Sequence, residues 1–266
     1  MTDVKDKDDD NSERGDRIAK VLARLGVASR RDAEKLIAER RVVLNGETVL
    51  TPATFVKEGD RLEVDGEKLG RQQKTRLFLY HKPPGLITTA KDPEGRTTVF
   101  ETLPSNLPRL ISVGRLDLNT EGLLLLTNDG ELSRALELPS TGLKRTYRVR
   151  VYGDYGGEDV LAKKLEKLKK GLFYKGVRYG SIDASLDEQQ KMDGHNYWIT
   201  MTLTEGKNRE IRNVLEAIGY RVSRLIRVAY GPFELEDMNR EEIVEVPIKA
   251  MRELLPEDVA KKITGG

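Results

Sequence analysis

The feature that most constrains this 266-residue chain is a polar loop that leads directly into an apolar run, GRLDLNTEGLLLL at 114–126. The apolar run is typical of a strand. Gly114 and Gly122 bracket the loop, and glycine adopts backbone angles that other residues avoid. Such a loop can hold Asp117 exposed yet fixed in place, as a nucleophile or general base requires. Taken alone, these residues are more simply interpreted as a surface loop with an ion pair between Arg115 and Asp117.

The composition excludes several kinds of site. The chain has no cysteine, which excludes disulfides, thiolate catalysis and cysteine-based zinc or iron–sulfur centres. Its two histidines, His81 and His195, lie far apart in the sequence, so a histidine metal centre is not expected. We assign chemistry to neither of them, and we expect no metal and no cofactor.

Charge is distributed unevenly along the chain. The 46 basic and 44 acidic side chains give a formal net charge of +2, but seven of the acids lie in the first sixteen residues. The remainder is therefore more basic than the total, which suits a polar partner. No apolar run approaches the roughly eighteen residues that span a membrane, and the N-terminus has no apolar signal segment. We expect a cytoplasmic, monomeric protein without a membrane partner.

The first part of the chain predicts a tail and a small folded module. Residues 1–15 are charged and lack apolar periodicity, so we expect them to be disordered. Residues 16–66 predict two helices and a small sheet: a helix from Arg17 to Leu25, a second capped by Ser29, a hairpin of 42–44 and 48–50 around Asn45-Gly46, and a strand at 61–64.

Basic side chains gather in the helical part of this module. There are eight of them, against three acids: Arg17, Lys20, Arg24, Arg30, Arg31, Lys35, Arg40 and Arg41. A solvated helical face and a phosphate-binding surface both fit this pattern. The order RIAKVLARLGVASRRDAEKLIAERRVVLNGETV resembles an S4 RNA-binding domain. That resemblance implies contacts with structured RNA from four of these residues, Arg17, Arg24, Arg30 and Arg31.

The second part of the chain predicts a mixed sheet. We interpret 67–76 as a polar linker, 77–250 as a second domain and 251–266 as a C-terminal extension. Strands are expected at 77–80, 111–113, 123–127, 144–152, 177–186, 197–204, 222–230 and 233–235, and helices at 131–138, 158–170 and 211–218. We expect a loop at 81–85, because prolines do not fit a strand ladder. Strands outnumber helices and often follow one another directly, which predicts an α+β fold with a mostly antiparallel mixed sheet and flanking helices.

Four segments of the second domain resemble, in order, the motifs of the bacterial ribosomal RNA pseudouridine synthases. They are HKPPG at 81–85, GRLDLNTEG at 114–122, KRTYRVRV at 144–151 and EGKNREIRNVLEAIG at 205–219. The segments NTEGLLLLTNDGEL and EGKNREIR most closely resemble the large ribosomal subunit pseudouridine synthase B group. Each motif alone is weak, but four in order after an S4 domain are specific. The resemblance implies a catalytic domain that isomerises uridine in RNA without a cofactor.

The resemblance also implies roles for three residues. Asp117 matches the family's nucleophile, and an ionised carboxylate suits attack on carbon. Arg212 matches the cation that keeps this carboxylate charged. Tyr147 matches the active-site tyrosine, whose ring can stack on the target base and whose hydroxyl can take part in proton transfer. From the residues alone, Arg212 also fits a solvent-facing helical arginine, and Tyr147 fits a core tyrosine.

Further residues of these motifs are expected to contact the substrate RNA: Arg115, Lys207, Asn208, Arg209, Leu225 and Lys82. By resemblance, Arg115 helps to open the RNA and fills the gap left by the extruded base, a step that costs a few kcal/mol. The run 207–209 precedes a helix, so it can contact phosphate together with the helix N-terminus or simply cap the helix. Leu225 fits either a pocket wall or plain core.

These features predict an RNA pseudouridine synthase that flips a uridine, in a loop of 23S ribosomal RNA, towards Asp117. One alternative is an enzyme of the same class that acts on 16S ribosomal RNA. Another is a non-catalytic S4 protein that only binds or remodels RNA, which the intact Asp117, Tyr147 and Arg212 disfavour. The sequence has no G-x-x-x-x-G-K-[ST] loop, so an ATP-driven remodeller is also disfavoured.

Overall fold

The computed structural model describes residues 15–70, 73–153, 156–187 and 196–263. The chain divides into two compact units between Thr75 and Arg76. The predicted disordered tail lies outside the described residues except for Gly15.

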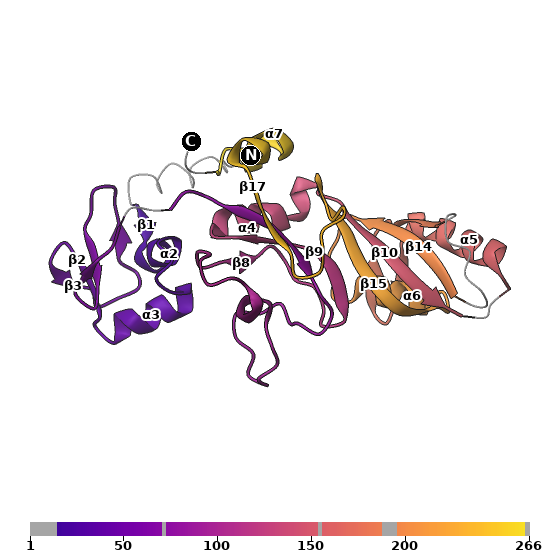
Figure 1. Cartoon of the computed structure of the whole chain (residues 1–266), viewed down its shortest axis with the longest axis horizontal. Coiled ribbons are helices and arrows are strands. Elements are labelled where there is room, and N and C mark those ends of the chain that lie inside the picture. The colour runs from indigo at the N-terminus through magenta and orange to yellow at the C-terminus, as the bar shows by residue number, and fades with distance from the viewer. Residues whose placement is uncertain (1–14, 71–72, 154–155, 188–195, 264–266) are drawn as a thin grey trace, which may run out of the picture. The chain divides into compact units, whose positions relative to one another are not determined.

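The N-terminal unit combines two helices with short strands (Figure 1, indigo to purple). Its elements are β1 Asp16–Arg17, α2 Ile18–Arg24, α3 Arg30–Ala38, β2 Val42–Leu44, β3 Glu47–Thr48, β4 Phe55–Val56, β5 Leu62–Val64 and β6 Glu67–Lys68. Four of the strands form a sheet in the order β3-β2-β5-β6, and β1 pairs with β4.

Local sequence signals explain most of this unit. The Ser29 side chain caps α3 by accepting a hydrogen bond from the Asp32 N–H. The predicted hairpin forms around Asn45-Gly46, where both residues have positive φ. The apolar faces of α2 and α3 pack with β2 through Ile18, Ile37 and their neighbours. One prediction was wrong: β6 lies inside the segment interpreted as a linker, because Glu67 and Lys68 pair with β5.

The second unit is built on a nine-stranded sheet in the order β13-β14-β10-β15-β9-β7-β17, with β16 added on β15 and β8 on β9. Its strands are β7 Leu77–Lys82, β8 Ile111–Ser112, β9 Thr120–Thr127, β10 Arg145–Tyr152, β13 Asp183–Leu186, β14 Asn196–Leu203, β15 Arg221–Tyr230, β16 Phe233–Glu234 and β17 Ile243–Val246. All the pairings are antiparallel except β15 with β9. The predicted mixed, mostly antiparallel sheet is confirmed.

Helices and one separate hairpin complete this unit. They are α4 Gly130–Glu137, α5 Glu158–Lys167, α6 Glu210–Ala217, α7 Ile248–Leu254, α8 Glu257–Ala260, the 3-10 turns η1 Val99–Thr102, η2 Pro139–Thr141 and η3 Leu168–Lys170, and the hairpin β11 Leu172–Tyr174 with β12 Val177–Tyr179. The strand predicted at 177–186 is therefore two strands, since β12 pairs with β11 and β13 pairs with β14.

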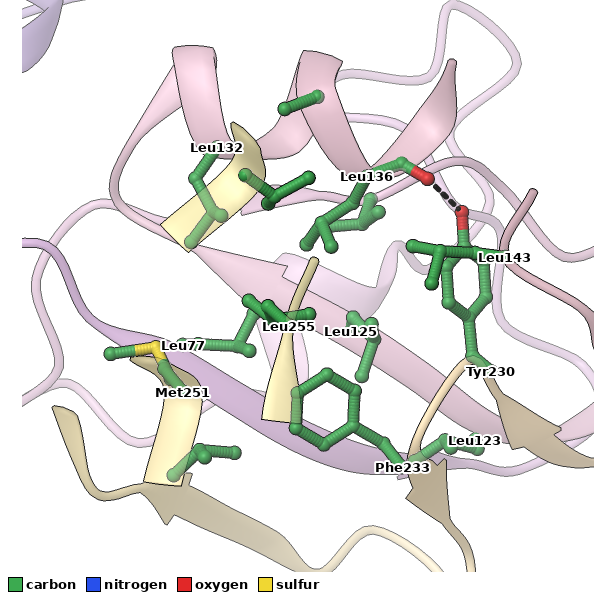
Figure 2. Packing of buried hydrophobic residues seen from close by; sticks show 14 of the residues in the cluster. Leu77, Leu123, Leu125, Leu132, Leu136, Leu143, Tyr230, Phe233, Met251 and Leu255 are labelled. Atoms are coloured by element: carbon green, nitrogen blue, oxygen red, sulfur yellow. Dashed lines mark hydrogen bonds between the residues drawn. The ribbon is translucent and has the colours of Figure 1, made fainter. Parts of the chain in front are cut away.

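Three cores hold the unit together, and one of them packs β7 and β9 on the segment 86–116. Of the two that involve the helices, one packs α5 and α6 on β10, β14 and β15. The other packs β7 and β9 against α4, α7 and α8, as Figure 2 shows for Leu77, Leu123, Leu125, Leu132, Leu136, Met251 and Leu255. Leucines of β9 therefore meet helices that come both directly after the strand and from the end of the chain.

The segment interpreted from sequence as a C-terminal extension belongs to this second core. Met251, Leu255, Val259 and Ile263 are each at most 5% exposed. Residues 264–266 lie outside the described ranges. The predicted loop at 81–85 also needs correction. β7 continues through Lys82, because the His81 N–H donates to the Glu242 carbonyl beside β17, and the loop begins only at Pro83.

Gly122 lies where β9 meets β15, opposite Arg227, with a φ of +105°. A Cβ atom there would collide with the Arg227 carbonyl oxygen. We expect Gly122→Ala to lower the free energy of unfolding of this unit by about 3 kcal/mol. Gly114→Ala is the control, because Gly114 has a φ of +66° but open space around it, and it should lose only about 1 kcal/mol. Urea unfolding followed by fluorescence of Trp198 tests both, and equal losses would contradict the steric explanation.

Candidate active site

The loop that carries Asp117 connects β8 to β9, and three anchors hold its backbone. The Thr88 hydroxyl donates to the Leu116 carbonyl over 3.0 Å and accepts from the Leu116 N–H over 3.3 Å. The Thr120 N–H donates to the Asp117 carbonyl over 3.0 Å, which closes a turn around the carboxylate. The third anchor is Lys82. The predicted rigid presentation of Asp117 therefore has a physical basis in these bonds.

Lys82 is fully buried, so the contact with RNA predicted for it is not accessible in this structure. Its Nζ atom donates to the carbonyls of Pro83, Leu118 and Thr120 over 3.0, 3.3 and 2.9 Å. Lys82 thus ties the end of β7 to both sides of the Asp117 turn. Burial lowers the pKa of Lys82 to about 8, while the negative charges of Asp117 and Glu121 act against this shift.

The buried position of Lys82 predicts a pH dependence of stability. Its pKa falls from the ordinary 10.5 to about 8 on folding, so between these pH values the unfolded chain binds more protons. The free energy of unfolding of the wild type, measured relative to Lys82→Met, should therefore rise as the pH increases from 8 to 10.5. Urea unfolding of both proteins across this range measures the difference. A difference that stays constant or falls would contradict the prediction.

A cavity of about 290 Å³ opens beside Asp117. This volume is at the lower end of the roughly 300–1,000 Å³ of small-molecule sites. Seven of the residues predicted for the site line it: Arg115, Asp117, Tyr147, Lys207, Arg209, Arg212 and Leu225. They come from the β8–β9 loop, β10, α6 with its preceding loop, and β15, so the fold brings together segments more than a hundred residues apart.

The cation bonded to Asp117 is Arg209, not Arg212. The Arg209 Nη1 atom lies 3.8 Å from Asp117 Oδ2, and both side chains are at least 36% exposed. Arg212 lines the same cavity, but its only hydrogen bond to a described residue runs from Nη1 to the Val222 carbonyl over 3.4 Å. Burial and the charge of Arg209 lower the pKa of Arg212, while Asp117 raises it. The predicted direct pairing of Arg212 with Asp117 is therefore absent from the free protein.

The side chains of 207–209, which the sequence offered as a possible helix cap, do not cap α6. Glu210 holds the loop before the helix instead. Glu210 Oε2 accepts a 2.9 Å hydrogen bond from the Lys207 N–H, and Arg209 stands at the N-cap with a φ of +49° and no side-chain cap. Lys207 Nζ is bonded to Glu205 over 2.7 Å. The exposed Asn208 does not line the cavity, and its carbonyl accepts from the Asn213 side chain.

Tyr147 and Leu225 belong to both the core and the cavity. Tyr147, half-buried in β10, pairs with Met201 and Arg227 and packs against two cores. Leu225 is 5% exposed and also lines the cavity. Leu225 is thus both core and pocket wall, and Tyr147 is a core tyrosine that also lines the cavity.

Three buried charged residues that sequence reasoning missed also line the cavity: Arg145, Glu210 and Arg227. Arg145 donates to the Tyr230 hydroxyl and the Thr204 carbonyl, and Arg227 Nε donates to the Leu123 carbonyl over 2.7 Å. Burial raises the pKa of Glu210. The sequence could have predicted that Arg145 points inward. It lies on the same face of the alternating strand as Tyr147 and Val149.

In the N-terminal unit, Arg17, Arg30 and Arg31 are exposed and available to a polyanion. Arg24 differs, because only 17% of its side chain is exposed and it is ion-paired with Asp16. Among the described ranges, no group of three or more His, Asp or Glu side chains is arranged to hold a metal ion. In the same part of the chain, no helix has the length and apolar character to cross a membrane.

Comparison with known proteins decides the family. Residues 16–62 match the S4 domain, and residues 76–217, more than half of the chain, match RNA pseudouridylate synthase. The chain belongs to the RNA pseudouridylate synthase family. The resemblance inferred from the motifs is confirmed, and so is the α+β fold with an S4 domain ahead of the catalytic domain.

Individual relatives agree with this assignment. The chain is 50% identical over 222 residues to a Rickettsia felis protein named "Uncharacterized RNA pseudouridine synthase", covering 84% of this chain and 93% of the relative. It is 39% identical over 255 residues to "Ribosomal large subunit pseudouridine synthase B" of Yersinia pestis, covering 92% and 78%. A solved structure titled "Crystal structure of pseudouridylate synthase" is 26% identical with a TM-score of 0.60, covering 90% of this chain and 99% of that one. The protein is an RNA pseudouridine synthase.

Proposed function

We propose that this enzyme converts a uridine of 23S ribosomal RNA to pseudouridine, with Asp117 as the nucleophile. The cavity beside Asp117 carries the proposal, because its walls combine the Asp117 carboxylate with five arginines and with Tyr147. The ribosomal RNA substrate is suggested by the similarity to the large-subunit synthase of Yersinia pestis. The enzyme would act as a monomer in the cytoplasm.

The reaction needs no partner reagent. Isomerisation breaks the bond from N1 to C1′ of the ribose, forms a bond from C5 to C1′, and moves one proton from C5 to N1. Atoms and electrons balance within the nucleotide, so a nucleophile and a proton carrier are sufficient. Asp117 would supply the ionised oxygen that attacks carbon, and the Tyr147 hydroxyl would take part in the proton transfer.

The cations of the cavity would act in two ways. Arg209 and Arg212 would keep Asp117 ionised when the flipped base excludes water from the cavity. The exposed Arg115, two residues before Asp117, would fill the gap that the base leaves in the RNA. Tyr147, which lines the cavity together with Leu225, would stack on the base.

The exposed arginines of the S4 domain would anchor the RNA by its phosphates. Exchanging Arg17, Arg30 and Arg31 together for Gln should make the slope of log affinity against log salt shallower by about 2, at roughly 0.7 per lost contact with single-stranded RNA. Exchanging Lys57, Arg61 and Lys68, three exposed cations outside the helices, is the matched control. Equal slopes for the two variants would mean that the helical arginines do not contact RNA.

Mapping pseudouridines tests the proposed function. Purified enzyme is incubated separately with 23S and 16S ribosomal RNA transcripts, and the ribosomal RNA of a deletion strain is mapped in parallel. We expect one pseudouridine to form in 23S RNA in vitro and the same one to be missing from the deletion strain. A site in 16S RNA would establish the alternative substrate. Modification of neither RNA would refute a ribosomal RNA substrate.

A further inference from the structure

A row of arginines lies on the face of the sheet that points away from α5 and α6. In the sheet register Arg150 pairs with Trp198 on β14 and with Arg224 on β15, and directly paired residues share a face. Arg148 lies two residues before Arg150 and therefore on the same face. The alternate residues, such as Val149 and Leu225, point the other way into the core beneath α5 and α6.

Carboxylates and an indole ring hold these guanidinium groups in place. Arg148 is bonded to Asp187 over 2.8 Å, and its guanidinium carbon lies 4.7 Å from the centre of the Trp198 ring. Arg224 is bonded to Glu121 over 2.6 Å and lies 5.9 Å from the same ring. Because the side chains are already ordered, a ligand that binds them loses little side-chain entropy.

The surface keeps an excess of positive charge. Arg240 shares Glu121 with Arg224, at 2.9 Å, so the arginine face comprises Arg148, Arg150, Arg224 and Arg240 against two bonded carboxylates. The side chains of Arg224 and Arg240 are 43% and 55% exposed, whereas that of Glu121 is only 6% exposed. The guanidinium groups of Arg224 and Arg240 are therefore exposed to solvent, whereas the Glu121 carboxylate that orders them is buried beneath them.

None of the four arginines lines the cavity beside Asp117. The buried Nε atom of Arg150 has no hydrogen-bond partner among the described residues. An exposed aromatic ring, Tyr152, continues the row at 41% exposure. Ordered guanidinium groups beside an exposed aromatic ring suit a polyanion with stackable bases better than an acidic protein surface.

We propose that the arginine face is a second RNA-binding surface, which holds phosphates of the substrate outside the flipped nucleotide. The proposal rests on the proposed function only in taking RNA as the partner. Phosphate oxygens would bind the guanidinium N–H groups that Asp187 and Glu121 leave unused. The RNA would thereby be held on the side of the sheet opposite Tyr147 as well as in the cavity.

The test variant exchanges Arg150 and Arg240 for Gln. These two are chosen because the ion pairs Arg224–Glu121 and Arg148–Asp187 remain intact in the variant. Neither carboxylate is therefore left without a cation. The control exchanges Lys249 and Lys261 for Gln, two lysines with 87% and 72% exposed side chains that each pair with a glutamate one turn away. Affinity for a 23S ribosomal RNA transcript is measured against salt, and the single-turnover rate is measured at saturating RNA.

We expect the arginine variant to bind roughly tenfold more weakly than the control, with a salt slope shallower by about 1.4 for two lost contacts. Its single-turnover rate at saturating RNA should be unchanged. The double exchange to Lys should restore most of the affinity, which excludes misfolding as the cause. Binding does not require turnover, so this result is independent of whether the mapped pseudouridine lies in 23S RNA.

Two outcomes would overturn the proposal. If the affinity and salt slope of the arginine variant equal those of the control, the face does not bind RNA. If the affinity for naked RNA is unchanged while the affinity for a pre-ribosomal particle falls, the partner is a protein.

Discussion

Replacing Asp117 with Asn is expected to abolish pseudouridine formation while RNA binding persists. The amide keeps the size and hydrogen-bonding groups of the side chain but has no ionised oxygen to attack carbon. Loss of a nucleophile of this kind lowers the rate by roughly 10⁴-fold or more. The measurement is single-turnover conversion of an RNA substrate, with RNA affinity measured beside it.

Two companion variants make this prediction specific. Asp117→Glu keeps the charge but moves it by one methylene, and its rate should also fall strongly, because the turn held by Thr88 and Lys82 fixes where the carboxylate must stand. Glu94→Gln removes an exposed carboxylate from a neighbouring loop and should leave the rate unchanged. Turnover by Asp117→Asn near the wild-type rate would remove this residue from the mechanism.

Replacing Arg212 with Met should separate activity from stability. The guanidinium is half-buried, its Nε atom has no partner within the described ranges, and burial lowers its pKa. Burying a charge without an ion pair costs free energy, and methionine fills a similar volume without that cost. We expect the single-turnover rate to fall by roughly 10²–10³-fold, as for other electrostatic groups in active sites, and the free energy of unfolding to rise by about 1 kcal/mol.

Arg209→Met is the matched comparison, because Arg209 is 55% exposed and makes the ion pair with Asp117 that Arg212 does not. An exposed pair contributes about 0–1 kcal/mol, so this variant should change little in stability and lose less activity than Arg212→Met. Thermal and urea unfolding, together with single-turnover rates, distinguish the two. If Arg212→Met is destabilised and active, the arginine is a structural residue and Arg209 alone serves the nucleophile.

The sequence by itself determined the features that are encoded over a few neighbouring residues. Ser29 predicted a helix start, Asn45-Gly46 predicted a hairpin, and the alternation around Tyr147 predicted an inward-facing strand side. The loop around Asp117 and the strand after it could also be predicted from the sequence, because glycines favour a loop and a run of leucines favours a buried strand. The fold class followed from these local signals, whereas the seven predicted residues of the cavity wall came from the resemblance to the family's motifs, and Arg145, Glu210 and Arg227 were missed.

Only the tertiary structure decided which side chains meet across the sheet. The sequence places Lys82 in a loop. In the structure the hydrogen bond from the His81 N–H to Glu242 extends β7, and the Lys82 amine is buried against the Asp117 turn. Arg209 and Arg212 lie three residues apart, which is less than one helical turn. Only the position of α6 relative to β9 determines which of the two pairs with Asp117. Such choices depend on long-range register, where a shift of one residue turns every side chain to the other face, and no local pattern carries that information.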